Sequence, residues 1–298
     1  MRVFTIAIII VLSYYNSIEN SFAFDDHLAI VNNNDVKSTT SWIDLWSHDI
    51  WGKGLQSIDS HRSYRPLLIC VFKLIVHTCG FQAQIFRMVS VALHFVVSVL
   101  VYQVSLKLFK NDIIAFGCSL LFSSHPIHVE SVSAVVNMAE ALSAIFYLIA
   151  YDIFLSSTNS SYELLVWAIC IIASVLFKET GVTIAGMVVS RCLIDLFVAV
   201  NKAHLMKQIE EWAKTSTHWI LASFMTIGCY VTFRLFLIKV GLIRLVGAIV
   251  RLDISFIVNS FSKSYLGDSQ LIRKAENPFA FLVGQEKGLS LMVRFMQS

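Results

Sequence analysis

The amino-acid sequence predicts an all-α protein that crosses a membrane several times. Of its 298 residues, 56% are hydrophobic and only 14% are charged, and the mean hydropathy is +0.70. A soluble domain carries roughly a quarter charged residues. The apolar residues gather in blocks close to the ~20 residues that a helix needs to cross the hydrocarbon. Only helices or closed barrels satisfy their backbone in lipid, and no barrel-like alternation appears, so these blocks are predicted to be helices.

Charge and cysteine content exclude several classes of function. The net charge is +3, and no cluster of Lys and Arg suggests a nucleic-acid partner. The six cysteines form no C-x-x-C pair and fall mostly inside apolar runs, which argues against a zinc site or a disulfide framework. A bond between Cys70 and Cys79 stays open if their segment faces an oxidising compartment.

The first apolar run, residues 3–15, follows Arg2 and has two interpretations. It is either a signal peptide, with Ser21-Phe22-Ala23 as a small-residue cleavage site, or an uncleaved first membrane helix that extends to about Phe24. In both cases residues 1–23 form the first segment, and the chain then enters the lumen of the endoplasmic reticulum.

Residues 24–80 are predicted to be a luminal loop with two interfacial helices. The first has apolar residues at helical spacing, with tryptophans suited to a membrane interface. These residues are Trp42, Leu45, Trp46, Ile50 and Trp51. The second covers 64–80, where Lys73 interrupts a short apolar run.

The membrane bundle is predicted to lie within residues 81–239. Its expected spans are 84–108, 112–124, 136–155, 162–177, 181–200 and 217–238. The second span is short, and we expect it to continue through residues 125–130 in protein or a cavity. Basic residues in alternate turns orient the bundle by the positive-inside rule. A second luminal loop over 240–285 and the start of a truncated span over 286–298 complete the prediction.

Ionisable residues collect at the luminal ends of these spans. Such groups are costly at membrane depth and usually mark a site or a pathway. They form four clusters: Asp25-Asp26, His61 to Arg65, His125-Pro-Ile-His128-Val-Glu130, and Lys178-Glu179. We expect these clusters to converge on one luminal cavity.

The cluster chemistry leaves several roles open. One of the adjacent carboxylates Asp25 and Asp26 is suited to act as a general base towards a hydroxyl, and the alternative is a helix cap or a solvated turn. The residues His125, His128 and Glu130 are either divalent-metal ligands or a structural polar network around Pro126. The cations Arg65, Arg87 and Lys178 are candidates to hold a phosphate. For Arg87 and Lys178 the alternative is that they extend to the interface or pair with nearby Asp or Glu.

Six motifs occur in order: FDDHLAIVNNNDV, SWIDLWSHDIWG, SHRSYRPL, HPIHVE with its following AE, FKETG and AENPFAF. Together they resemble the transmembrane and tetratricopeptide-repeat O-mannosyltransferase family of animals over about residues 22–295. The resemblance implies a GT-C-like helical bundle in the endoplasmic reticulum membrane. It also implies transfer of mannose from dolichyl phosphate mannose to Ser or Thr of secretory-pathway proteins such as cadherins, with inversion at the sugar.

Carried over residue by residue, the resemblance implies that Asp25 or Asp26 is the catalytic base. It implies that His125, His128 and Glu130 line the donor phosphate and that Arg65 and Glu179 hold further luminal positions. Glu140 matches the acidic residue of a Gly-Arg-Ala-Glu motif.

Two departures leave a second hypothesis open. The short motif reads Asn137-Met138-Ala139-Glu140, without its arginine, and the C-terminal spans and tetratricopeptide repeats of the family are not in the sequence. The alternative is a non-catalytic membrane scaffold or regulatory subunit on the same fold. A transporter would place its ionisable groups near the bilayer midplane, which this pattern does not.

Overall fold

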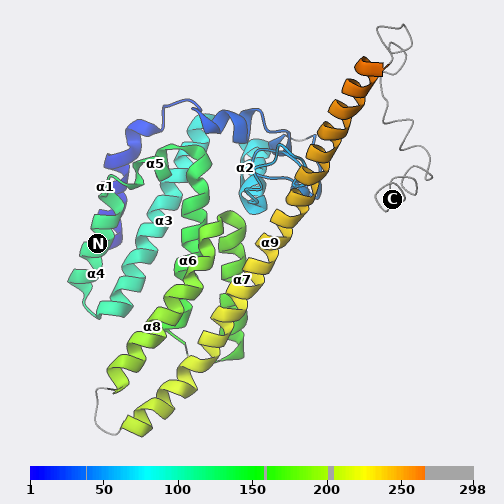
Figure 1. Ribbon diagram of the computed structural model, residues 1–298. Helices are drawn as coiled ribbons and strands as arrows, with labels where there is room; N and C mark the ends of the chain where they lie inside the picture. The colour runs from blue at the N-terminus through cyan, green and yellow to red at the C-terminus, as the bar shows by residue number, and fades with distance from the viewer. Residues whose placement is uncertain (38, 158–159, 201–204, 266–298) are drawn as a thin grey trace. The chain divides into compact units, whose positions relative to one another are not determined.

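The computed structural model describes residues 1–37, 39–157, 160–200 and 205–265, with side chains in the last range placed for 206–236. Its helices are α1 (Arg2–Tyr14), α2 (Pro66–Cys79), α3 (Ala83–Phe109), α4 (Asp112–Ser124), α5 (His128–Ser133), α6 (Met138–Leu155), α7 (Ser161–Phe177), α8 (Thr183–Val200) and α9 (Leu205–Tyr265) (Figure 1). Short 3-10 or π turns cover Tyr15–Ser17, His27–Val31, Asn34–Val36, Asp44–Ser47, Val135–Asn137 and Glu179–Val182. Within the described ranges, the extended backbone forms only one isolated bridge, between His48 and Gly54.

The helices confirm an all-α polytopic membrane protein. Among the described residues, four helical segments are long and apolar enough to cross a membrane: Ala83–Phe109, Val135–Leu155, Glu179–Val200 and Met206–Phe236. The other apolar helices are shorter than 18 residues. Within the compact unit Met1–Leu242, α3 packs against α1, α4 and α6, and α6 packs in turn against α7 and α8. Helix α5 and the loop that precedes α2 lie at the same end of this bundle (Figure 1).

Helix α1 packs into the bundle through one buried face. Ile6, Ile10 and Tyr14 recur every four residues, as expected of one side of a helix, and are at most 4% exposed. They contact Phe95 of α3 and Phe116 of α4, among others. This packing is what the membrane-helix interpretation of the first apolar run expects, although the regular helix ends at Tyr14.

The predicted continuation of the second span through residues 125–130 is wrong. Helix α4 ends at Ser124, and His125 has an extended backbone, with φ −69° and ψ 129°. The ring of Pro126 disfavours a helical conformation in the residue before it, which explains the break. A separate helix, α5, then begins at His128.

The prediction of a first interfacial helix around Trp46 is also wrong. In the first polar loop (residues 24–65), only one 3-10 turn, Asp44–Ser47, occurs near the tryptophans, and Trp42 and Trp46 are 47% and 43% exposed. The buried Asp49 carboxylate organises the backbone instead. It accepts hydrogen bonds from four donors: the N–H groups of Trp51, Lys53 and His61 and the hydroxyl of Ser60. Such local side-chain bonds compete with helix formation.

The helix predicted over residues 64–80 corresponds to α2, and its interrupting Lys73 has a structural role. The Lys73 side chain is 4% exposed, and its ammonium donates to the carbonyls of Asp35, Lys37 and Thr40 at 3.1, 2.7 and 2.7 Å. A buried charge is costly unless its donors are satisfied, and here three carbonyls satisfy them. Lys73 therefore fastens the first polar loop to α2.

Two further predictions differ from the structure. Helix α9 begins 12 residues before the expected start at 217 and continues to Tyr265, so the part of the predicted loop 240–285 that is described is helical. Residues 266–298, including the rest of that loop and the predicted truncated span, lie outside the described residues. Cys70 and Cys79 are both free thiols on α2, and nine residues of helix separate them by about 13 Å, too far for a disulfide.

Candidate functional site

The two adjacent aspartates have different environments. Asp26 is 1% exposed, and its Oδ1 accepts the backbone N–H of Val136 at 2.9 Å, while its Oδ2 accepts that of Ala23 at 3.4 Å. Asp25 is exposed to solvent. Neighbouring side chains point in different directions, so one residue anchors the segment to the bundle and the other stays accessible.

The guanidinium of Arg87 is hydrogen-bonded to backbone carbonyls. Arg87 of α3 is 3% exposed, and its guanidinium donates to the carbonyls of Asn20, Ser21 and Ser133. These bonds hold the segment after α1 against the end of α5. Arg87 is therefore a structural clamp in this conformation, with its charge directed at carbonyl oxygens.

A cavity of about 960 Å³, here called the Asp25 cavity, opens beside these residues. Its ionisable lining consists of Asp25, Asp26, Glu130 and Arg87. The segment after α1 supplies one wall, and the α4–α5 connection and α5 supply another. Three carboxylates against one guanidinium make this cavity acidic.

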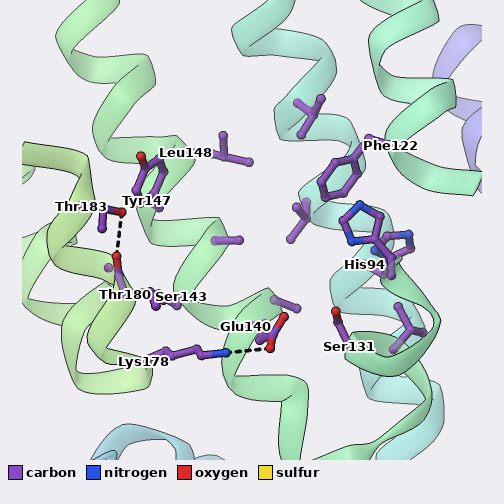
Figure 2. A pocket seen from close by; sticks show the side chains of 17 residues that line it. His94, Phe122, Ser131, Glu140, Ser143, Tyr147, Leu148, Lys178, Thr180 and Thr183 are labelled. Carbon is purple, nitrogen blue, oxygen red and sulfur yellow. Dashed lines mark hydrogen bonds and ion pairs between the residues drawn. The ribbon is translucent and has the colours of Figure 1, made fainter. Parts of the chain in front are cut away.

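A second cavity of about 460 Å³, here called the Lys178 cavity, lies among α3, α4, α6 and the turn after α7. Its polar lining includes His128, Ser131, Glu140 and Lys178. Its apolar lining includes Val97, Val101, Phe122, Ala144 and Leu148. Figure 2 shows the charged groups at one end and Leu148 and Phe122 further along α6 and α4.

Helix α5 separates the two cavities. Its residues Val129, Glu130 and Ser133 line the Asp25 cavity, while His128, Ser131 and Val132 line the Lys178 cavity. Side chains three apart share a helix face, so this short helix presents one face to each. The expectation of a single cavity is therefore wrong for the described residues. Three of the predicted clusters contribute side chains to one or both of these two cavities, and the cluster from His61 to Arg65 lines neither.

Two ion pairs stand at the polar end of the Lys178 cavity. The Lys178 ammonium contacts Glu140 Oε1 at 2.6 Å, and Figure 2 shows Glu140 pointing towards Ser131. Next to it, Arg65 donates from Nε and a terminal nitrogen to Glu179 Oε2 at 3.1 and 3.0 Å. Each pair joins distant parts of the chain, and Lys178 reaches the cavity itself.

Three histidines and Phe122 form a group of tilted and edge-on ring contacts, of which His94, His128 and Phe122 line the cavity. The His128 ring lies 4.2 Å from Phe122, 5.5 Å from His94 and 6.3 Å from the exposed His125, measured between ring centroids. Burial, followed by the nearby His125, lowers the pKa of His128 from its ordinary value, and Glu140 opposes the shift. The imidazole of His128 is therefore neutral at pH 7.

A metal site is not formed by the described residues. No group of three or more His, Cys, Asp or Glu side chains among them is placed to hold an ion. The reason is the α5 partition, because His128 faces one cavity and Glu130 the other. This geometry favours the polar-network interpretation of His125, His128 and Glu130.

Met138 occupies the position where the family motif has arginine, and it is fully buried. It belongs to an apolar cluster that includes Ile69, Phe72 and Phe177. A side chain at this position points into the core and lines neither cavity. Met138 therefore supplies no side chain to either cavity, whereas Lys178 lines the Lys178 cavity.

Part of the Lys178 cavity was not predicted from the sequence. His94, Ser143, Tyr147 and Thr180 line it and were not singled out. His94 carried a recognisable signal, because an ionisable residue inside an apolar span usually has a function or a partner. Its ring is 4% exposed and contacts the carbonyl of Ser123 at 3.1 Å.

Comparison with curated proteins identifies relatives over about two thirds of the chain. Protein O-mannosyl-transferase TMTC1 of Homo sapiens is 37% identical over 207 residues, which cover 64% of this chain and 23% of that protein. TMTC3 of Homo sapiens is 35% identical over 199 residues (64% and 21%), and TMTC4 of Mus musculus is 32% identical over 224 residues (67% and 30%).

The matched segment is thus less than a third of the length of these relatives. No family model matches the chain. No solved structure matches it either.

Proposed function

The chain belongs to the TMTC family of protein O-mannosyl-transferases, and from this premise we propose that it forms the membrane-embedded transfer site of such an enzyme. One observation carries the proposal. An acidic cavity with an accessible carboxylate and a second cavity with a cation and an apolar wall lie on the two faces of one short helix, α5. A hydroxyl acceptor suits the first cavity, and a lipid phosphate suits the second.

The Lys178 cavity has the chemistry for a lipid-linked sugar donor. The donor is dolichyl phosphate mannose, whose phosphate would meet the Lys178 ammonium while its isoprenoid chain lies along apolar side chains such as Val97, Val101 and Leu148. Charge develops on the phosphate as the sugar departs, and a fixed cation stabilises that charge. A volume of about 460 Å³ falls within the usual range of small-molecule sites.

The Asp25 cavity has the chemistry for activating the acceptor. In the proposed step, the carboxylate of Asp25 takes the proton of a Ser or Thr hydroxyl. For this step the mannosyl group of the donor has to extend past α5 into the Asp25 cavity, where the hydroxyl oxygen forms a bond to C1 of mannose with inversion. The bond from C1 to the phosphate oxygen breaks, and its electron pair stays on the dolichyl phosphate. Asp26 serves as a positioning residue, because its buried carboxylate accepts a hydrogen bond from the backbone N–H of Val136.

The compartment and the acceptors follow from the same proposal. The cavities face the lumen of the endoplasmic reticulum, where Ser and Thr of secretory-pathway proteins, cadherins among them, are the acceptors. The other ionisable residues of the sequence motifs then support the site. Arg65 and Glu179 fix the turn that carries Lys178, and His128 shapes the α5 side of the Lys178 cavity, with the ring of His125 beside it.

The test is mannose transfer from dolichyl phosphate mannose in membranes that contain this chain. We expect Asp25→Asn to reduce transfer by about 10²- to 10⁴-fold, the usual contribution of a general base. Asp59→Asn is the matched control, because Asp59 is an exposed carboxylate of the same loop that lines neither cavity. Full transfer by Asp25→Asn would overturn the role of Asp25. No transfer by the inserted, unaltered chain would leave the scaffold hypothesis instead.

A further inference from the structure

The Asp25 cavity carries negative charge that its own residues do not neutralise. The buried carboxylate of Asp26 accepts hydrogen bonds from two backbone N–H groups. The guanidinium of Arg87 donates to three backbone carbonyls. Asp25 and Glu130 are both exposed, and among the described residues neither has an ion-pair partner. The cavity therefore presents two carboxylates to whatever enters it.

An apolar rim accompanies these carboxylates. Phe24 is 94% exposed, Ile127 is 71% exposed and Val129 is 50% exposed, and all three line the Asp25 cavity. The backbone of Phe24 has φ +46°, a left-handed conformation that is rare for a bulky residue and clusters at functional sites. The rim is built from two segments about 100 residues apart, the turn after α1 and the start of α5.

The size of the cavity exceeds what one hydroxyl side chain needs. Its volume of about 960 Å³ is at the upper end of the range for small-molecule sites. Residues on both sides of an acceptor Ser or Thr therefore enter the cavity with it. Their charges meet the two carboxylates, and their apolar side chains meet the rim.

We propose that the Asp25 cavity selects acceptor segments in which a basic residue lies close to the Ser or Thr, and that the Glu130 carboxylate binds this basic side chain. The inference rests on the proposed function and names its acceptor class. Asp25 remains with the hydroxyl, and Glu130, which lies on the face of α5 away from Lys178, supplies the specificity. Apolar neighbours of the acceptor dock on Phe24 and Ile127.

Synthetic acceptor peptides that differ only beside the Ser or Thr test this selection. We expect Lys-flanked peptides to have about tenfold higher kcat/KM than Glu-flanked peptides, because exposed charge pairs have modest effects and the two peptides differ in sign. The preference should shrink as salt is added, since the groups are solvent-exposed. Equal rates for Lys-flanked and Glu-flanked peptides would overturn the inference.

Variants of Glu130 assign the effect to this residue. Glu130→Gln should flatten the preference, and Glu130→Lys should reverse it in favour of Glu-flanked peptides. Asp59→Asn, outside both cavities, should keep the preference of the unaltered chain. A preference that persists unchanged in both Glu130 variants would show that another surface reads the acceptor.

Binding without donor separates this inference from the proposed function. Fluorescence anisotropy of labelled peptides, with the full chain in lipid nanodiscs, reports binding whether or not transfer occurs. Preferential binding of the basic peptide that depends on Glu130, with no transfer, would support the cavity as a basic-segment site and refute the enzyme. Transfer to all peptides without a preference would support the enzyme and refute the selection.

Discussion

Asp26 and Val136 lie 110 residues apart in the chain, yet the carboxylate of the first accepts the backbone N–H of the second at 2.9 Å. The bond joins the turn after α1 to the 3-10 turn Val135–Asn137, which lies between α5 and α6. Because Asp25 immediately precedes Asp26 in the chain, the position of Asp25 relative to the bundle depends on this bond. The buried aspartate holds the exposed one in place.

The first prediction concerns this anchor. Asp26→Ala should lower the free energy of unfolding by about 1–3 kcal/mol, since it leaves the buried N–H of Val136 without an acceptor. Asp25→Ala, at an exposed position, should change stability little. Thermal unfolding of both variants in detergent checks this. Equal melting temperatures for the two variants would contradict the anchoring role.

The second prediction concerns the cation of the Lys178 cavity. Lys178→Met should lower kcat/KM for dolichyl phosphate mannose by about 100-fold, because the variant cannot stabilise charge on the leaving phosphate. Lys178→Arg keeps the charge and should retain much of the activity. Transfer kinetics at varied donor concentration distinguish the two variants. An unchanged donor kcat/KM in Lys178→Met would exclude Lys178 from donor binding.

The third prediction concerns the turn after α7. A Cβ on Gly181 would lie 2.6 Å from the backbone carbon of Ser174 and 2.8 Å from the backbone nitrogen of Val175. Gly181→Ala should therefore destabilise the fold by about 1–3 kcal/mol and displace the turn that carries Lys178.

Gly186→Ala is the matched control for this substitution. A Cβ there meets no atom within 4 Å, and alanine in a helix interior is worth about 0.5–1 kcal/mol over glycine. Melting temperatures should fall for Gly181→Ala and stay level or rise for Gly186→Ala. A tolerated Gly181→Ala would mean that α7 and this turn are less closely packed than the structure shows.

The fourth prediction concerns pH. Burial lowers the pKa of His128 below its ordinary value, so the folded chain binds fewer protons at this imidazole than the unfolded chain does. As the pH falls through about 6.5, the unfolded chain binds a proton that the folded chain resists. The free energy of unfolding therefore decreases with falling pH, by at most about 1.4 kcal/mol per pH unit from this residue.

Melting curves between about pH 7.5 and about pH 5.5 check the prediction. His128→Gln should lose less stability across this window than the unaltered chain, because the variant has no imidazole to protonate. His27→Gln, at an exposed position of the first polar loop, should behave like the unaltered chain. Parallel curves for His128→Gln and the unaltered chain would place His128 in a solvated environment.

Hydrophobic blocks predicted most of the helices from the sequence, because membrane burial depends on composition over a whole segment. The expected span 84–108 corresponds to α3, for example, and 162–177 to α7. The first polar loop could not be predicted in the same way. Its helical spacing around Trp46 was overridden by the hydrogen bonds of Asp49, which link residues up to 12 positions apart.

The candidate site, like the fold, was predicted from the sequence only in part. Asp25 and Lys178 could be predicted because they are ionisable residues at the ends of apolar segments. The free-energy cost of placing such a residue in lipid depends on the residue type itself. The separation into two cavities depends on α5, a helix of six residues that follows the proline-induced break. Which side of such a short helix faces which neighbour is a tertiary property. His128 and Glu130, two residues apart, were therefore expected together and lie in different cavities.

The attachment of the first polar loop to Lys73 has a consequence for the order in which the chain assembles. The carbonyls that Lys73 binds, those of Asp35, Lys37 and Thr40, leave the ribosome more than 30 residues before Lys73 does. During synthesis, the loop has no partner for these groups until α2 has emerged. The loop that carries Asp25 can thus complete its contacts only after the following helix has been made. The hydrogen bond of Asp26 forms later still, because Val136 is synthesised after α2.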